Sequence, residues 1–205
     1  MTGLAAAYEI QGLQGKGVIT HLKHFAFNEC ETERNGIGIW LNEQEARELL
    51  LTPFEIAVTK GDTGAIMSSF NRLGATWAGG SKALMTNVLR DEWGFRGVGI
   101  SDFNLYGYMF ADQGTRAGTD MQLSFSKPFA DTTSATARIA IRKALKNMLY
   151  MTANSNAMNH VAPGTIISYT TSPFTSLYVT TATKVTGTVS KVVLTDNKRP
   201  YLLLL

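Results

Sequence analysis

Asp102 is the residue of this chain best placed to do chemistry, because it closes a short apolar segment that is predicted to be a strand. Residues 97–100 read Gly-Val-Gly-Ile, and a nearly continuous apolar run is typical of a buried strand in a parallel sheet. In β/α barrels, catalytic groups stand at the carboxyl-terminal ends of such strands. We therefore take Asp102 as the candidate catalytic carboxylate. The alternative for this position is a helix N-cap at a strand–helix junction.

Lys23 is a second candidate, because it lies near the end of another predicted strand, residues 17–24. An amine in an apolar pocket can form a Schiff base with a carbonyl substrate. The polar loop over residues 28–35 follows directly and argues against such an aldolase-like role. Further alternatives are a structural ion pair for Lys23 and a buried, hydrogen-bonded role for His24.

The elements that must position these residues alternate between strand and helix along the chain. The predicted strands are residues 17–24, 64–70, 97–102 and 117–123. The predicted helices are residues 42–58, 81–93 and 134–152. Repeated strand–helix units imply a parallel sheet, and about four such units are half of an eightfold barrel. The predicted fold class is α/β, a partial TIM-type (β/α) barrel.

Local signals support the predicted helices. Asn42 and Glu45 have the spacing of a capping box, and Pro53 is expected to kink or restart the helix. Apolar residues at helical spacing predict the inward-facing side chains. These are Ala46, Leu49, Leu50, Phe54, Ala57 and Val58, then Met85, Val88, Leu89 and Trp93, and finally Ala137, Ile141, Leu145, Met148 and Leu149.

A change in composition predicts two parts. Residues 1–160 contain the strand–helix units, whereas residues 161–205 are rich in Thr and Ser between short β-prone runs, at residues 166–169 and 192–194. The second part is predicted to be a linker or tail. A hairpin that docks on the first part and a poorly ordered tail both agree with this pattern.

Composition excludes several classes of function. The chain has 205 residues, of which 44% are hydrophobic and 17% charged, as in an ordinary globular protein. The net charge of +3 without a dense basic run argues against nucleic-acid binding. Cys30 is the single cysteine, so no internal disulfide and no metal site are expected. No signal peptide or membrane span is visible, which weakly favours the cytoplasm unless the chain is a fragment.

Four ordered blocks of sequence carry a family resemblance. They are residues 84–97 with Ile100-Ser101-Asp102-Phe103, residues 22–26 with Asn28 and Glu31-Thr32-Glu33-Arg34, residues 65–72, and residues 116–121. Together they resemble the nucleophile region of glycoside hydrolase family 3, the β-glucosidase-like enzymes, over roughly residues 8 to 164. The resemblance implies the second half of the family's catalytic (β/α)₈ barrel.

The resemblance also implies roles for individual residues. Asp102 would be the nucleophile of a retaining exo-β-glycosidase, which works by double displacement with two carboxyl groups about 5–5.5 Å apart. Phe70 stands where many relatives carry Tyr, and Phe103 where many carry Trp. Arg72 would pair with a carboxylate near the site or with an acid of a loop. The implied substrate-binding residues are Lys23, His24, Met67, Phe70 and Phe103, and the implied supporting residues are Arg34, Arg72 and Asp120.

Two parts of the family pattern have no match in this chain. The acid/base glutamate, which in the family comes from a separate α/β sandwich domain, is missing, and so is the first half of the barrel. The resemblance therefore implies an enzyme that is incomplete on its own, completed by the same protein or another chain. A β-linked glucoside or oligosaccharide is the implied substrate, with no cofactor. The alternative is an inactive carbohydrate-binding or interaction module derived from the same barrel.

Overall fold

The computed structural model describes residues 1–124, 129–155, 165–170, 178–184, 192–196 and 199–203. Contacts divide the chain into two units, Met1–Ser155 and Asn156–Leu205. In the second unit, β7 (Thr165–Thr170) pairs antiparallel with β8 (Tyr178–Lys184), and β9 (Val192–Asp196) with β10 (Arg199–Leu203). The two β-prone runs of the sequence lie in β7 and β9. The role of this segment as a linker or tail stays a prediction.

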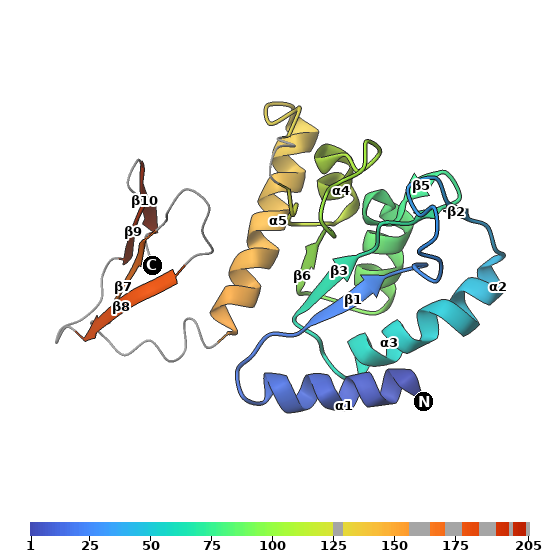
Figure 1. The fold of residues 1–205 in the computed structure, drawn as a ribbon, viewed down its shortest axis with the longest axis horizontal. Helices are drawn as coiled ribbons and strands as arrows, with labels where there is room; N and C mark the ends of the chain where they lie inside the picture. The colour runs from blue at the N-terminus through green and yellow to red at the C-terminus, as the bar shows by residue number, and fades with distance from the viewer. Residues whose placement is uncertain (125–128, 156–164, 171–177, 185–191, 197–198, 204–205) are drawn as a thin grey trace. The chain divides into compact units, whose positions relative to one another are not determined.

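A parallel sheet of three strands forms the centre of the first unit (Figure 1). Its order is β1 (His21–Phe25), β3 (Ala65–Ser68) and β6 (Val98–Ile100). Leu22 lies opposite Ile66, and Ile66 lies opposite Gly99. Ala65, Ile66 and Val98 are fully buried, as the apolar pattern of these strands requires. The predicted α/β fold class, part of a (β/α) barrel, is confirmed.

The fourth predicted strand, residues 117–123, is shorter than expected. Helix α4 (Ala111–Ala117) occupies its first residue, and Gly118 ends this helix with a φ of +114°. A glycine adopts this left-handed conformation at a helix end without steric cost. After it, Met121 forms a single parallel bridge to Ile100. The chain therefore passes where a fourth strand was predicted, but only Met121 pairs with the sheet there.

The first predicted strand also begins later than expected, at His21. Helix α1 (Thr2–Gln14), which the sequence analysis did not predict, and the turn after it occupy the preceding residues. Gln14 Oε1 accepts a hydrogen bond from Gly64 N at 2.7 Å, so this turn is tied to the start of β3.

The helical segment after residue 42 begins as predicted and then changes phase. Asn42 and Glu45 form the capping box at the start of α2 (Glu43–Glu45). A π-helical segment, η1 (Ala46–Leu51), then leads into α3 (Thr52–Thr59), which has Pro53 in its first turn. Leu49 is 68% exposed, so its predicted inward position is wrong. The wider π-helical turn shifts the phase of the helix and buries Leu51 instead.

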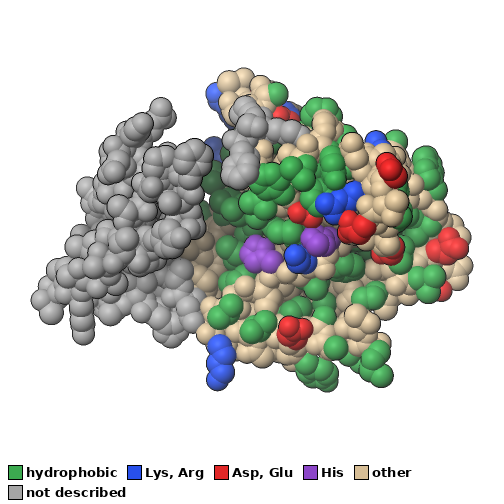
Figure 2. Space-filling view, viewed as in Figure 1, with side chains coloured by type: hydrophobic (Ala, Val, Ile, Leu, Met, Phe, Trp, Pro, Cys, Tyr) green, Lys and Arg blue, Asp and Glu red, His purple; other side chains and the backbone are tan. Residues whose placement is uncertain are grey.

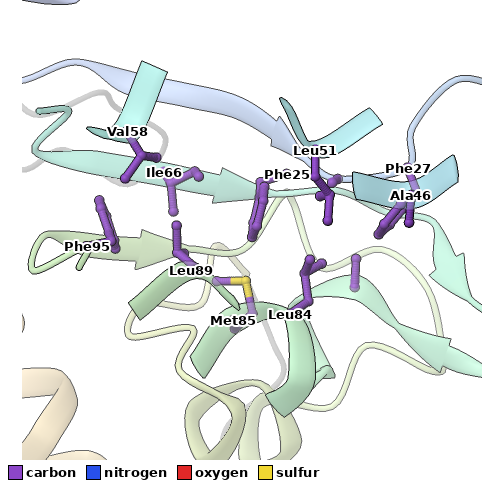
Figure 3. Packing of buried hydrophobic residues seen from close by; sticks show 12 residues of the cluster. Phe25, Phe27, Ala46, Leu51, Val58, Ile66, Leu84, Met85, Leu89 and Phe95 are labelled. Atoms are coloured by element: carbon purple, nitrogen blue, oxygen red, sulfur yellow. The ribbon is translucent and has the colours of Figure 1, made fainter. Parts of the chain in front are cut away.

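The main core lies between this sheet and its helices (Figure 3). Phe25 of β1 and Ile66 of β3 are fully buried against Met85 and Leu89, which come from the π-helical segment η3 (Ala83–Glu92). Val88 and Trp93 pack against the same core, as predicted. Each large side chain buried in this way stabilises the fold by about 1.5–3 kcal/mol.

The last helix of this unit, α5 (Ala135–Ala153), faces the core differently from the prediction. Ala137 is buried as predicted, but Leu145 and Leu149 are 51% and 62% exposed, and Ala144 is buried instead. The buried face of α5 therefore runs through Ala137 and Ala144, and the two leucines lie outside it. Within the described residues, no helix combines the length and apolar character that crossing a membrane requires.

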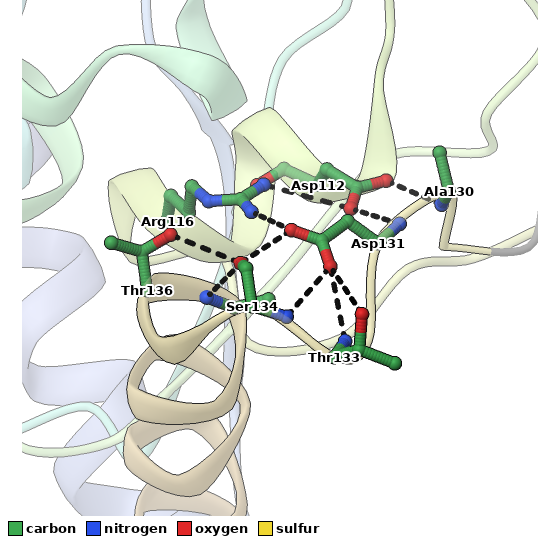
Figure 4. Close-up of polar contacts among 8 residues, drawn as sticks. Asp112, Arg116, Ala130, Asp131, Thr133, Ser134 and Thr136 are labelled. Atoms are coloured by element: carbon green, nitrogen blue, oxygen red, sulfur yellow. Dashed lines mark hydrogen bonds and ion pairs between the residues drawn. The ribbon is translucent and has the colours of Figure 1, made fainter.

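A polar network fastens the start of α5 to α4 (Figure 4). Ser134 is the N-cap, and its Oγ accepts a hydrogen bond from Ala137 N at 3.2 Å. Asp131 accepts bonds from Ser134 and from Arg116 of α4. The bonds from Ser134, followed by those from Thr133, hold the pKa of the Asp131 carboxyl well below its usual range.

The segments between the sheet and the helices add one small sheet. It consists of β2 (Gly38–Ile39), β4 (Arg72–Leu73) and β5 (Thr76–Trp77), followed by a 3₁₀ turn, η2 (Ala78–Gly80). β4 pairs parallel with β2 and antiparallel with β5. This sheet therefore holds together the chain that follows β1 and the chain that follows β3.

Candidate active site

Asp102 lies two residues beyond β6, and its carboxylate is held by two groups. Its Oδ1 accepts a hydrogen bond from Phe103 N at 2.7 Å, and its Oδ2 lies 3.2 Å from His24 Nε2. Its backbone N donates to Ser68 O at 3.2 Å. The side chain of Asp102 remains 15% exposed. The carboxylate is therefore fixed in orientation and still open to solvent.

His24 and Lys23 come from β1. The His24 side chain is 29% exposed, whereas Lys23 is exposed as a whole. Figure 2 shows the two described histidines close together on one face, with a basic side chain beside them. The open surroundings of Lys23 differ from the apolar enclosure that a Schiff-base lysine requires.

Three parallel strands bring the predicted residues to one edge of the sheet. Because β1, β3 and β6 run in the same direction, their carboxyl ends meet there (Figure 1). His24 lies at this end of β1, Phe70 two residues beyond β3, and Asp102 two residues beyond β6. Met67 and Phe103 are half-buried, and Phe70 is 6% exposed.

Arg34 and Arg72 lie in the segments that follow β1 and β3. Arg34 forms an ion pair with Glu31, and its guanidinium lies 4.2 Å from the centre of the Phe70 ring. Arg72 donates to two backbone carbonyls of residues 35–37, each at 3.3 Å. Backbone oxygens thus take up two of the Arg72 donors, and the expected pairing of Arg72 with a carboxylate stays a prediction.

Asp120 is bound in a buried network away from solvent. Its Oδ2 accepts hydrogen bonds from Arg90 Nη2 at 2.7 Å and from Gly99 N at 2.9 Å, and its Oδ1 accepts one from Asn147 at 2.9 Å. Burial raises the pKa of the Asp120 carboxyl, and the Arg90 charge opposes this effect. Asp120 thus ties β6 to η3 and α5.

Two tyrosines that the sequence analysis did not single out belong to the same edge. Tyr106 OH accepts a hydrogen bond from Arg34 Nε at 3.1 Å, and Tyr108 OH donates to Phe70 O at 3.0 Å. Their rings stack with centres 5.6 Å apart. A signal was present in the sequence, because both are aromatic residues within six positions of Asp102.

Two cavities of the first unit lie away from Asp102. One of about 640 Å³ borders α4 and is lined by residues that include Phe110 and Arg116, and another of about 460 Å³ lies between α4 and α5. In the described part of the chain, no three His, Cys, Asp or Glu side chains are grouped to hold a metal ion.

The arrangement supports nucleophilic chemistry at Asp102. A carboxylate that accepts one hydrogen bond and lies beside an imidazole retains lone pairs that can attack an electrophilic carbon. The described contacts of Asp102 involve no second carboxyl group. His24 and Lys23 offer donors that suit hydroxyl groups, and the neighbouring aromatic side chains offer apolar contact.

Comparison with protein families and curated proteins gives consistent matches. The model of the glycosyl hydrolase family 3 N terminal domain matches residues 1–162. A β-glucosidase of Rhizobium radiobacter is 40% identical over 123 residues, which are 60% of this chain and 15% of that protein. β-Glucosidase B of Emericella nidulans is 37% identical over 123 residues, 60% of this chain and 14% of that protein. The chain thus matches only a small part of these relatives.

Solved structures agree with the fold. The structure of β-glucosidase 3B from Thermotoga neapolitana in complex with glucose matches with a TM-score of 0.68 and 26% identity. That match covers 77% of this chain and 24% of the solved chain. A β-glucosidase from Kluyveromyces marxianus matches with a TM-score of 0.67 and 24% identity, over 78% of this chain and 20% of that one. This second likeness concerns the fold alone.

Proposed function

Because this chain belongs to glycosyl hydrolase family 3, we propose that it carries the nucleophile of a retaining exo-β-glycosidase. The substrates would be terminal β-glucosyl residues or related β-glycosyl residues. The observation that supports this most is the Asp102 carboxylate at the sheet edge, fixed by Phe103 N and His24 and still partly exposed. The β-glucosidase names of the relatives support the choice of sugar.

In the proposed reaction, an Asp102 carboxylate oxygen attacks the anomeric carbon of the sugar. The bond to the leaving-group oxygen breaks, and a covalent glycosyl-enzyme forms. Water then attacks the same carbon, which releases the sugar and restores the carboxylate. The bond from Phe103 N and the contact with His24 hold Asp102 in orientation and so reduce the entropic cost of the first step.

We propose that Lys23 and His24 bind hydroxyl groups of the sugar. Lys23 is exposed and the His24 side chain is 29% exposed, and both lie at the same sheet edge as Asp102. Met67, Phe70 and Phe103 would form the apolar part of the same subsite, and Arg34, Arg72 and Asp120 would support it.

We further propose that this chain is incomplete as a catalyst. No acid/base glutamate is assigned within it, and its match covers 15% of the Rhizobium enzyme. The remaining barrel half and the acid/base domain would come from the same protein or from another chain. Loss of general acid catalysis alone costs about 10²–10⁴-fold in rate. A substrate with a good leaving group avoids much of that loss, because its departure needs no proton.

The test is mass spectrometry after incubation with 2-deoxy-2-fluoro-β-glucosyl fluoride, a probe that traps retaining nucleophiles. We expect a glycosyl adduct on the peptide that contains Asp102, and no adduct in Asp102→Asn. Asp91→Asn is the matched control, because Asp91 is an exposed aspartate of η3, and it should be labelled like the wild type. Labelling of Asp102 should be faster when the remaining barrel half and the acid/base domain are present. An adduct on another residue would contradict the assignment, and absence of any adduct in the completed, folded protein would favour the binding module.

A further inference from the structure

Five side chains from the three segments that follow β1, β3 and β6 contact one another at the edge that carries Asp102. We call this group the loop clamp. It consists of Arg34, Phe70, Arg72, Tyr106 and Tyr108. Each parallel strand of the sheet is thus followed by at least one member of the clamp.

Arg34, Phe70 and Tyr106 form a closed triangle within the clamp. Arg34 Nε donates to Tyr106 OH at 3.1 Å, and the Arg34 guanidinium lies 4.2 Å from the Phe70 ring centre. The Tyr106 ring meets the Phe70 ring edge-on, with centres 5.3 Å apart and an interplanar angle of 69°. Because each member contacts the other two, the position of each depends on both others.

Tyr108 and Arg72 extend this connection. Tyr108 OH donates to Phe70 O at 3.0 Å, and its ring stacks on Tyr106. The Arg72 guanidinium lies 4.7 Å from the Tyr108 ring centre and donates to backbone carbonyls of residues 35–37. The segment after β1 is therefore linked to the other two segments twice, once through Arg34 and once through Arg72.

The segment that carries Asp102 needs such side-chain contacts, because residues 101–110 contain no helix or strand. Its start is held by backbone bonds, from Asp102 N to Ser68 O and from Asn104 N to Leu123 O. Four residues after Asp102, Tyr106 makes the bond that crosses to the segment after β1. A catalytic group on a loop keeps its geometry only when neighbouring side chains hold that loop.

We infer that Tyr106 is a positioning residue for Asp102, which it holds in orientation through its contacts with Arg34 and Phe70. This inference rests on the proposed role of Asp102 as the nucleophile. The Tyr106 hydroxyl, through its bond with Arg34, acts on the rate at which Asp102 attacks, whereas the Tyr106 ring keeps the contact with Phe70 on which sugar binding depends.

The first test compares Tyr106→Phe with Tyr8→Phe in saturation kinetics of labelling by 2-deoxy-2-fluoro-β-glucosyl fluoride. Tyr106→Phe removes the hydroxyl and keeps the ring, and Tyr8 is a 71% exposed tyrosine of α1. Displacement of a reacting group by about 1 Å can cost about 10²-fold in rate. We expect Tyr106→Phe to lower the maximal labelling rate roughly tenfold, with the half-saturating probe concentration unchanged. A rate equal to that of Tyr8→Phe would overturn the inference.

A second variant tests whether Tyr106 acts through Arg34. Arg34→Lys keeps the positive charge and loses the planar group that donates to Tyr106 OH. In the Arg34→Lys background, Tyr106→Phe should produce no further loss of labelling rate, because both changes break the same bond. Additive losses would show that the two residues act independently, which would overturn the proposed route.

Amide hydrogen exchange separates failure of this inference from failure of the proposed function. If the wild type is not labelled at Asp102, the proposed function fails. Amide hydrogen exchange then still tests whether Tyr106 holds the loops in place. Tyr106→Phe should raise exchange about tenfold at residues 31–37 and 102–108, with the urea unfolding midpoint unchanged. Unchanged exchange in those segments, or an equal rise throughout the chain, would overturn the positioning role.

Discussion

Asp102 and Asp120 both lie next to β6, the last strand of the sheet, and their side chains differ in solvent exposure. The Asp102 side chain is 15% exposed, whereas the Asp120 side chain is 3% exposed. Asp102 follows β6 at its carboxyl end, while Asp120 precedes Met121, which bridges to β6.

The difference in bonding is equally clear. Asp102 is contacted by one backbone N–H and one imidazole, whereas Asp120 accepts three hydrogen bonds, one of them from the guanidinium of Arg90. A carboxylate offers about four lone-pair sites. Asp102 therefore retains capacity for a reaction, whereas most acceptor sites of Asp120 are occupied by the groups that it anchors. Exposure and remaining lone pairs, rather than residue type, separate a reactive carboxylate from a structural one.

The largest expected effect concerns Asp102→Asn. Labelling by the fluoroglucosyl probe should fall by at least about 10³-fold, because the amide is a poor nucleophile. The free energy of unfolding in urea should change by less than about 1 kcal/mol, since the amide oxygen still accepts the bond from Phe103 N. A large loss of stability would show that Asp102 is an anchor as well, and the comparison with Asp120 would break down.

For Asp120→Ala, in contrast, we expect a large loss of stability. This variant removes the acceptor of Gly99 N and Asn147 and the buried counter-charge of Arg90, which keeps only its bonds to backbone carbonyls. Removing one partner of a buried pair costs about 3–5 kcal/mol, and we expect about 3 kcal/mol here. Urea denaturation followed by circular dichroism measures it. A loss below about 1 kcal/mol would contradict the anchoring role.

The pH dependence of stability sharpens the comparison, because the pKa of Asp120 is raised in the folded state by burial. A group with a raised folded pKa contributes stability that is fully present below its unfolded pKa, about 3.9, and is lost as pH rises through the folded pKa. Relative to Asp120→Asn, which does not titrate, the wild type should lose stability from about pH 4 upwards. A difference that grows in the opposite direction would show that the Arg90 charge outweighs burial.

The smallest effect is expected for Ser134→Ala at the start of α5. Loss of this N-cap typically costs about 1 kcal/mol. Exchange of amides in the first turn of α5 should rise, while the amide proton of Gly99, which donates to Asp120, should keep its protection. A loss of protection at Gly99 would show that the start of α5 and the Asp120 anchor form one cooperative unit.

Much of the fold followed from local patterns in the sequence. The capping box at Asn42 and the apolar runs of β3 and β6 depend on neighbours close in sequence, so they could be predicted. The exposed Leu49 and Leu145 could not, because a π-helical turn in one helix and the tertiary packing of α5 change which face is buried. Helix α1 also escaped prediction, although its burial against α3 includes Ala7 and Ile10.

The sequence by itself determined the fold class, the family and the strand end at which Asp102 stands, because these depend on apolar periodicity and on short blocks of residues. Only the tertiary structure decided that His24 lies 3.2 Å from Asp102, that Arg72 bonds to backbone carbonyls, and that Tyr106 joins the edge. Those contacts join residues from different strand–helix units. Their geometry depends on how the strands align and how the loops pack, which spacing along the chain does not encode.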